Sequence, residues 1–303
     1  MTEMSHAAIS LAGVFPPITT PFDADGEVHY QALEENLERW NQYDLAGYVV
    51  LGSNGEAVYL TDEERVRILE TARRVIPRNK LLLAGTGREA TRHTIAFTRR
   101  AAEAGADAAL VVTPHYYTAR MTPDSLLQHY LAVADASPIP VLIYNVPGFT
   151  GVNVDAATVG RAAGHPNIVG IKDTSGNINQ AADTVRLAGP AFQLLAGSAG
   201  FFFAGLAIGA VGGILALANI APAQCIEIYR LSKAGRWAEA AELQRRMLPV
   251  NAAVTARFGI AGLKAAMDML GYYGGPVRSP LLEPSEGDRQ ALRNILIEGG
   301  ILS

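Results

Sequence analysis

The chain is poor in cysteine and has no large excess of charge of either sign. Its 303 residues include one cysteine, Cys225, and the 25 Lys and Arg against 29 Asp and Glu leave a formal net charge of −4. A single thiol cannot form an internal disulfide, which favours a reducing compartment. A mildly acidic chain does not attract nucleic acid or an anionic membrane, so neither is expected as a partner. The 49% of hydrophobic residues suffices for one large globular domain with an appendage.

The chain also lacks a convincing membrane span and a targeting segment. Its longest apolar stretch, Phe201 to Ile220, is interrupted by glycines and predicts a helix, a turn and a strand. The first residues include Glu3 and no arginine, unlike a signal or transit peptide. We therefore expect a cytoplasmic protein.

Motifs for metal, dinucleotide or serine-hydrolase chemistry are weak or missing. The six histidines include no helical pair four residues apart and no acidic neighbours that complete a ligand set, so a metal-dependent aldolase is not favoured. Gly85 to Ala90 (GTGREA) superficially matches a dinucleotide fingerprint, but lies in the third strand–helix unit without a first-unit counterpart. Ala196 to Gly200 (AGSAG) lacks the leading glycine of a hydrolase elbow, and we expect it to pack a strand against a helix.

What the chain does have is a repeated alternation of short apolar runs and amphipathic helical patterns. Eight runs predict strands: Gly13 to Pro16, Gly47 to Leu51, Leu81 to Gly85, Ala108 to Thr113, Val141 to Asn145, Ile168 to Lys172, Gln193 to Gly197 and Val211 to Leu215. Helices are expected at Tyr30 to Tyr43, Thr61 to Val75, Thr91 to Ala104, Thr122 to Ala136, Asp155 to Ala163, Ala223 to Ala234, Trp237 to Met247 and Phe258 to Leu270. This pattern predicts an α/β fold, a (β/α)8 TIM barrel over residues 1–220, with a C-terminal helical extension over 221–303.

Lys172 lies where the sixth apolar run meets a loop. A lysine in low-dielectric surroundings has a lowered pKa, and its neutral amine can attack a ketone to form a Schiff base. The alternative is a lysine that extends its ammonium to solvent from a strand end. Barrel enzymes carry their catalytic residues at the C-terminal ends of the strands. The residues at the C-terminal ends of the other strands therefore decide between a reactive and a solvated Lys172.

Three further strand ends carry polar groups. Gly52-Ser53-Asn54-Gly55 follows the second strand, and the N–H groups of such a turn can form an anion-binding nest; a plain turn is the alternative. Tyr116 follows the fourth strand and Tyr144 lies in the fifth. A phenol held by a neighbouring hydroxyl can relay protons, although a lone tyrosine can also serve only as a lid. An amine, phenols, hydroxyls and a nest are what a Schiff-base enzyme for a 2-oxo acid needs.

These residues resemble the dihydrodipicolinate synthase and N-acetylneuraminate lyase superfamily of class I aldolases. The resemblance runs from about Gly13 to Pro280 and rests on these motifs: PITTPF at 17–22, GSNGE at 52–56, VTPHYY at 112–117, YNVP at 144–147, GIKD at 170–173 and GILALAN at 213–219. It implies a Schiff base without a cofactor, and usually a homotetramer built as a dimer of dimers.

The resemblance also implies roles for individual residues. Lys172 would form the Schiff base with pyruvate or its adduct, and Tyr144 would donate and accept protons. Tyr116 would complete a Ser53-Tyr116-Tyr144 relay in a neighbouring subunit's site. The substrate would contact the residues around its carboxylate and keto group, which are Gly52, Ser53, Asn54, Gly55, Thr174 and the backbone of Ile214.

The substrate within the superfamily is harder to predict. Dihydrodipicolinate synthases typically carry a threonine pair in the glycine-rich turn and an arginine two residues after the position of Pro147, where this chain has Phe149. A phenyl ring cannot replace a bidentate guanidinium. The signature of sialic-acid lyases after the lysine is not well reproduced by Asp173-Thr174 either.

The closest resemblance is to 4-hydroxy-2-oxoglutarate aldolase, which yields pyruvate and glyoxylate. It extends through GADAALVVTPHYY at 105–117, LAGSAGF at 195–201 and residues 251–275. Alternatives are a dihydrodipicolinate synthase, which condenses pyruvate with aspartate semialdehyde, a dehydratase or hydratase-aldolase of sugar-acid or aromatic breakdown, and a non-catalytic barrel that binds a 2-oxo acid. The last would be marked by loss of the lysine or of both phenols, and none is missing.

Overall fold

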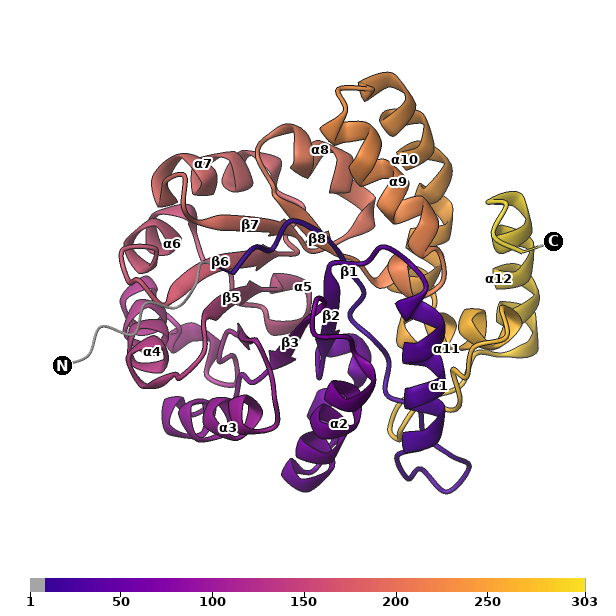
Figure 1. Ribbon diagram of the computed structural model, residues 1–303, viewed down its shortest axis with the longest axis horizontal. Helices are drawn as coiled ribbons and strands as arrows, with labels where there is room; N and C mark the ends of the chain where they lie inside the picture. Colours follow the sequence, from indigo (N-terminus) through magenta and orange to yellow (C-terminus); the bar gives the residue numbers. More distant parts are fainter. Residues whose placement is uncertain (1–8, 303) are drawn as a thin grey trace.

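The structure, a computed structural model, describes residues 9–302 and confirms the predicted (β/α)8 barrel (Figure 1). The prediction that the chain lacks a targeting segment used Glu3 and its neighbours, which lie outside this range. The strands are β1 (Gly13–Phe15), β2 (Gly47–Val50), β3 (Leu81–Gly85), β4 (Ala108–Val112), β5 (Val141–Asn145), β6 (Ile168–Asp173), β7 (Gln193–Ala196) and β8 (Gly212–Ile214). Every predicted strand is present within two residues of its expected ends.

The strands are parallel and lie in the order β1-β8-β7-β6-β5-β4-β3-β2. Backbone bonds join the two outer strands and close the sheet: Ile18 N–H donates to Val49 O at 3.0 Å, and Val49 N–H donates to Pro16 O at 3.0 Å. Most strand residues are buried on both faces, which is why the strands appear in the sequence as continuous apolar runs.

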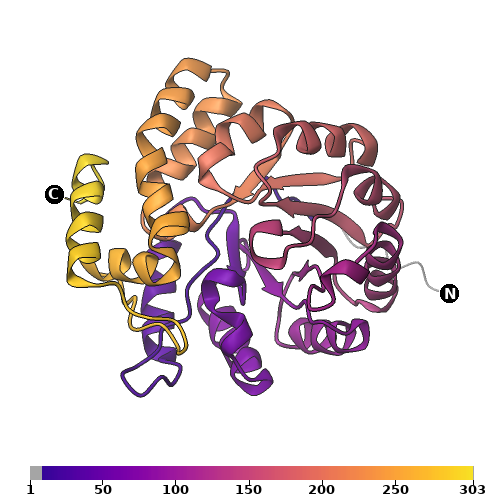
Figure 2. The ribbon, with the colours of Figure 1, turned by 180° about the vertical axis from the view of Figure 1, so that it is seen from behind.

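Helices cover the outside of the barrel on all sides (Figures 1 and 2). Thr61 begins α2 with a capping box, in which its hydroxyl accepts from Glu64 N–H and the Glu64 carboxylate accepts from Thr61 N–H. The helices between strands are α1 (Tyr30–Asn41), α2 (Asp62–Val75), α3 (Thr91–Glu103), α4 (Pro123–Ala136), α5 (Pro147–Thr150), α6 (Ala156–Ala162), α7 (Ile178–Ala188) and α8 (Phe202–Ala207).

The described elements after residue 220 are all helical. They are α9 (Pro222–Lys233), α10 (Trp237–Ala252), the π-helix η6 (Ala253–Arg257), α11 (Gly259–Met269) and α12 (Glu286–Glu298). The predicted end of the second of these helices at Met247 is wrong, because α10 continues past Pro249 to Ala252 and buries Val250 and Asn251. Helix α12 was not predicted.

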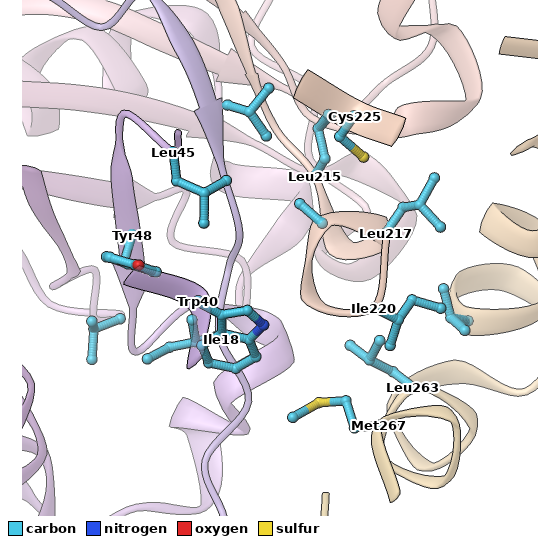
Figure 3. Close-up of a cluster of buried hydrophobic side chains, with 14 of the residues drawn as sticks. Ile18, Trp40, Leu45, Tyr48, Leu215, Leu217, Ile220, Cys225, Leu263 and Met267 are labelled. Carbon is cyan, nitrogen blue, oxygen red and sulfur yellow. The ribbon is translucent and has the colours of Figure 1, made fainter. Parts of the chain in front are cut away.

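The extension shares its core with the barrel (Figure 3). Trp40 of α1 is 1% exposed and its indole N–H donates to Asn219 O at 3.0 Å. In the same cluster Leu263 and Met267 of α11 and Cys225 of α9 are fully buried together with Tyr48 of β2. The division at residue 220 stays a prediction, but the core is continuous across it. Within residues 9–302, no helix combines the length and apolar character needed to cross a membrane.

Candidate active site

The amine of Lys172 and the phenol of Tyr144 meet at the C-terminal ends of two neighbouring strands. Tyr144 on β5 and Lys172 on β6 are partners in the parallel register, so their side chains emerge side by side. Lys172 Nζ lies 4.0 Å from the centroid of the Tyr144 ring. The two residues are 4% and 5% exposed. Lys172 therefore does not extend to solvent, and the alternative of a solvated strand-end lysine is wrong.

The next residue on each strand fixes this pair in place. Asp173 is buried, and its Oδ1 accepts from Asn145 Nδ2 at 3.0 Å and from Ser175 N–H at 2.9 Å. Asn145 Nδ2 also donates to Asn153 Oδ1 at 2.9 Å. Sequence reasoning assigned no role to Asn145 and Asp173, although both follow their strand-end partners directly in YNVP and GIKD. Because β6 extends through Asp173, the strand is one residue longer than predicted.

The glycine-rich turn after β2 brings a hydroxyl to the same place. Residues Ser53–Gly55 form a 3₁₀ turn, η1, and Ser53 Oγ lies 3.2 Å from the hydroxyl oxygen of Tyr144. Thr20 Oγ1 donates to Gly55 O at 2.7 Å and ties the turn to the segment after β1. The first N–H groups of a helical turn have no partner within it, so those of Ser53 and Asn54 suit an anion. Whether they bind one stays a prediction.

Two cavities open over these groups. The first, of about 510 Å³, is lined by Asn54, Tyr144, Lys172 and Thr174, with Ser198 and Asn251 among its further polar residues. The second, of about 400 Å³, is lined by Gly52 and Ser53 on the other side of Tyr144. Both cavities share Tyr144, Phe149, Ile260 and Leu281 as wall residues. The site is therefore one divided cleft, with Tyr144 facing both parts.

Three of the predicted site residues lie away from the cavities. Tyr116 is 77% exposed and packs edge-on against Tyr117, with the ring centroids 5.1 Å apart. Ile214 is fully buried, and Gly55 packs against the segment after β1, where an added Cβ would lie 3.2 Å from Ile18 O. Among the described residues these three do not line either cavity.

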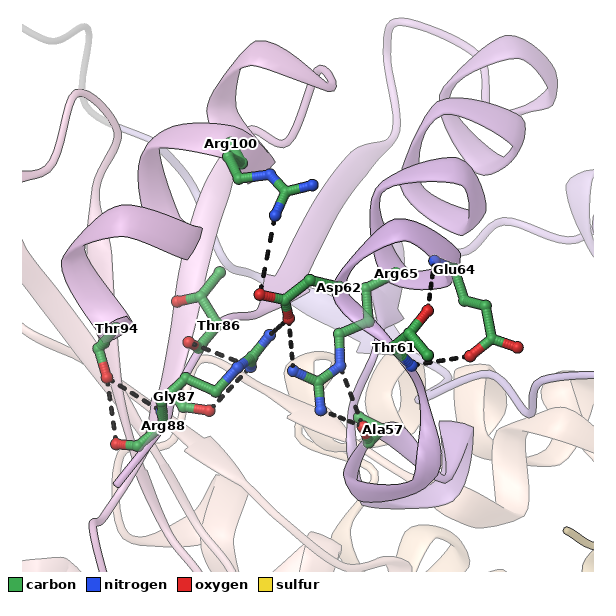
Figure 4. A network of polar contacts seen from close by, with 10 residues as sticks. All are labelled: Ala57, Thr61, Asp62, Glu64, Arg65, Thr86, Gly87, Arg88, Thr94 and Arg100. Carbon is green, nitrogen blue, oxygen red and sulfur yellow. Dashed lines mark hydrogen bonds and ion pairs between the residues drawn. The ribbon is translucent and has the colours of Figure 1, made fainter. Parts of the chain in front are cut away.

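Two arginines that line the second cavity share one carboxylate, and Figure 4 shows their polar contacts. Arg65 and Arg88 line this cavity, and both donate to Asp62 Oδ1, at 3.1 and 3.0 Å. Burial would raise the pKa of Asp62, but the hydrogen bond and charge of Arg88 and the charges of Arg65 and Arg100 outweigh it and lower the pKa. Burial, and then the charge of Arg88, lowers the pKa of Arg65 to about 10. Within residues 9–302, no cluster of three or more His, Cys, Asp or Glu side chains is placed to hold a metal ion.

The fold and the site define a class, that of barrel enzymes with a buried amine at the C-terminal strand ends. Comparison with known proteins agrees. The sequence pattern of the dihydrodipicolinate synthetase family matches residues 10–298. The 4-hydroxy-tetrahydrodipicolinate synthase of Acidiphilium cryptum (strain JF-5) is 36% identical over 96% of this chain and 99% of its own. A probable mitochondrial 4-hydroxy-2-oxoglutarate aldolase of Emericella nidulans is also 36% identical, over 94% of both chains.

Solved structures of dihydrodipicolinate synthases also resemble the chain over almost its whole length. The chloride-inhibited dihydrodipicolinate synthase of Acinetobacter baumannii, complexed with pyruvate, has a TM-score of 0.92 at 33% identity and covers 97% of this chain and 100% of its own. The dihydrodipicolinate synthase of Bacillus anthracis has a TM-score of 0.92 at 28% identity, covering 95% and 98%. The chain belongs to the dihydrodipicolinate synthetase family and is a carbon–carbon lyase of the class I, Schiff-base type.

Proposed function

We propose that the chain cleaves 4-hydroxy-2-oxoglutarate, or a closely related 2-oxo acid, to pyruvate and glyoxylate or another aldehyde. The observation that carries this proposal is the buried Lys172 amine 4.0 Å from the Tyr144 ring, with Ser53 Oγ 3.2 Å from the Tyr144 hydroxyl. An amine beside a hydrogen-bonded phenol is the arrangement that carbonyl attack and proton relay require.

The proposed reaction begins with attack of Lys172 Nζ on the C2 carbonyl and loss of water to give a protonated imine. Tyr144 takes the proton of the C4 hydroxyl as the C3–C4 bond breaks, and the electron pair of that bond moves toward the imine nitrogen. The aldehyde leaves, the enamine is protonated at C3, and water hydrolyses the imine to release pyruvate. The protonated imine acts as the electron sink, so the proposed scheme uses no cofactor.

Substrate binding in this proposal follows the cleft. Ser53 and Asn54, with the backbone of Gly52 and Gly55, hold the carboxylate next to the keto group. Thr174, which lines the cavity beside Lys172, contacts the substrate from the opposite side. The backbone of Ile214 at the end of β8 also contacts the substrate in this proposal.

The choice of substrate rests on Phe149. This side chain lines both cavities and is 71% exposed, so the position expected to grip the carboxylate of aspartate semialdehyde carries a phenyl ring at the cleft wall. The relative from Emericella nidulans supports the same choice. The runner-up is 4-hydroxy-tetrahydrodipicolinate synthase, favoured by the names of several relatives of similar identity.

Assembly and location belong to the proposal as well. The exposure of Tyr116 is what a residue that reaches into a neighbouring subunit's site needs, and it fits the expected dimer of dimers. The cytoplasmic location and the absence of nucleic-acid and membrane partners stay predictions from the sequence.

The test is intact mass after incubation with pyruvate and borohydride, with wild type compared with Lys172→Ala. A pyruvyl adduct on wild type alone is expected; no adduct on either protein would refute the Schiff-base role of Lys172 and favour a non-catalytic barrel. Substrates are then compared directly. Release of glyoxylate from 4-hydroxy-2-oxoglutarate supports the proposal, whereas faster condensation of pyruvate with aspartate semialdehyde would favour the runner-up.

A further inference from the structure

The glycine-rich turn beside Tyr144 is enclosed by two residues in an unusual backbone conformation. Leu51 precedes the turn with φ of 62° and Glu56 ends it with φ of 51°. Within residues 9–302, these are the only two non-glycine residues with positive φ. Such a conformation is costly for a residue with a Cβ and persists where the surroundings hold it, often at functional sites. Something must therefore hold this turn from outside.

The carboxylate of Glu56 is held by residues from the C-terminal extension. Glu56 Oε1 lies 2.6 Å from Lys264 Nζ, and the two side chains are 0% and 1% exposed. Glu56 Oε2 accepts from the backbone N–H of Arg278 at 2.8 Å. Both oxygens of the last residue of the turn thus bind groups that follow it by more than two hundred positions.

Lys264 on α11 is itself fixed. Its ammonium donates to Pro276 O at 2.7 Å and lies 4.4 Å from the centroid of the Phe22 ring. The chain passes very close to its backbone, because a Cβ on Gly274 would lie 2.0 Å from Lys264 O. Burial lowers the pKa of Lys264, whereas the charge and hydrogen bond of Glu56 raise it.

We infer that Glu56 and Lys264 are positioning residues for the active site. Their ion pair holds the turn in the conformation that brings Ser53 Oγ to the Tyr144 hydroxyl and Asn54 to the cavity above Lys172. The inference rests on the proposed roles of Ser53 and Asn54 in binding the carboxylate. It makes α11 a part of the catalytic apparatus, although α11 supplies no reacting group.

The competing explanation is that the ion pair of Glu56 with Lys264 only stabilises the fold. Variants without these charges distinguish that role from a positioning role. A single substitution leaves the other charge buried without an opposite charge beside it, which destabilises the fold strongly. Removing both charges avoids that cost, and the stability of the double variant is expected to recover. Neutral side chains cannot rebuild the bond between the turn and α11, so function is expected to stay low when stability returns.

The experiment compares Glu56→Gln, Lys264→Met and the double variant. The readouts are Tm and the pyruvate concentration that gives half-maximal borohydride trapping. The single variants should lower Tm, and all three should need at least tenfold more pyruvate; kcat for cleavage should fall about 100-fold, the size expected for a misplacement of about 1 Å. The double variant should regain Tm relative to the single variants without regaining pyruvate affinity.

Asp107→Asn is the matched control. It removes the charge from the 3.0 Å ion pair between Asp107 and Arg73, which lies directly before β4 and away from the turn. This variant should lose stability and keep wild-type trapping. Wild-type pyruvate affinity in the folded double variant would overturn the inference. If the double variant does not fold, wild-type affinity in Glu56→Gln, measured well below its Tm, would overturn it equally. Absence of an adduct in the wild type would overturn the proposed function and this inference with it.

Discussion

Replacing Tyr144 with phenylalanine removes one oxygen from the middle of the site and little else. The ring that lies 4.0 Å below Lys172 Nζ is kept, so the packing around the amine is unchanged. The hydroxyl that is lost has Ser53 Oγ, at 3.2 Å, as its hydrogen-bond partner. Tyr144→Phe therefore tests proton relay separately from the environment of the lysine.

The expected loss follows from the role of that hydroxyl. Positioned general acid–base catalysis contributes about 10²- to 10⁴-fold, which corresponds to about 3 to 5 kcal/mol of transition-state stabilisation. One hydrogen bond contributes about 1 kcal/mol to stability, so the fold should be weakened far less than the reaction. We expect kcat for cleavage to fall by this factor while pyruvate still forms a trapped adduct after long incubation.

The assay is steady-state release of pyruvate, with Tyr130→Phe as the control. Tyr130 is also a buried tyrosine, and its hydroxyl donates to Val111 O at 3.3 Å outside the active site. This control should lose about 1 kcal/mol of stability and keep its kcat. A Tyr144→Phe variant within tenfold of wild-type kcat would refute the proposed relay.

Three further predictions concern assembly, pH and thiol chemistry. Tyr116 is 77% exposed and is proposed to act across a subunit interface, so dilution to folded monomers should abolish activity. Sedimentation and activity are measured on the same samples. A fully active folded monomer would contradict the proposal. Burial lowers the pKa of His129 to about 4, against the opposing charge of Glu89, so the folded state excludes a proton that the unfolded chain binds below about pH 6.5. The contribution of neutral His129 to the free energy of unfolding should be fully present above that pH and should fall by up to about 3 kcal/mol as the pH drops toward 4. In urea unfolding, His129→Gln should make the free energy of unfolding depend less on pH over this range. An unchanged pH dependence would show that other groups cause it. Cys225 is fully buried and burial raises the pKa of its thiol, so a thiol reagent should label it only on unfolding; labelling of the native protein at the rate of an exposed thiol would show that the core around α9 opens.

The barrel could be predicted from sequence because most strand residues are apolar and buried on both faces of the sheet, so that the strands appear as continuous apolar runs. The run before Lys172 illustrates this, since Ile168, Gly170 and Ile171 are buried and the strand ends beside the loop that follows Asp173. From the sequence, Lys172 and Tyr144 could be placed at the same end of the barrel, but their contact could not be predicted. Their contact depends on the register between β5 and β6, which no local pattern contains.

The C-terminal extension was harder to predict because its ends are set by packing. The helix predicted to end at Met247 continues through Pro249, although proline lacks an N–H group, and the π-helix η6 follows. Helix α12 was missed although Ser285 and Asp288 form a capping box, a signal that was present in the sequence. The ion pair of Glu56 with Lys264 could not be predicted, because its partners are distant in the chain and no local pattern shows which charges meet in the fold.

The residues of the site are held in place in two different ways. Lys172 and Tyr144 stand on neighbouring strands of the barrel, where backbone pairing fixes their spacing whatever surrounds them. Ser53 stands on a short turn with costly backbone angles at both ends, and such a turn holds its shape only through contacts outside itself. Thr20 of the barrel holds Gly55 of this turn, whereas Lys264 and Arg278 of the extension hold Glu56. Schiff-base formation should therefore depend on the barrel, and carboxylate recognition and proton relay on the barrel and the extension together. A division of the chain at residue 220 would then separate the reactive amine from the elements that make it selective.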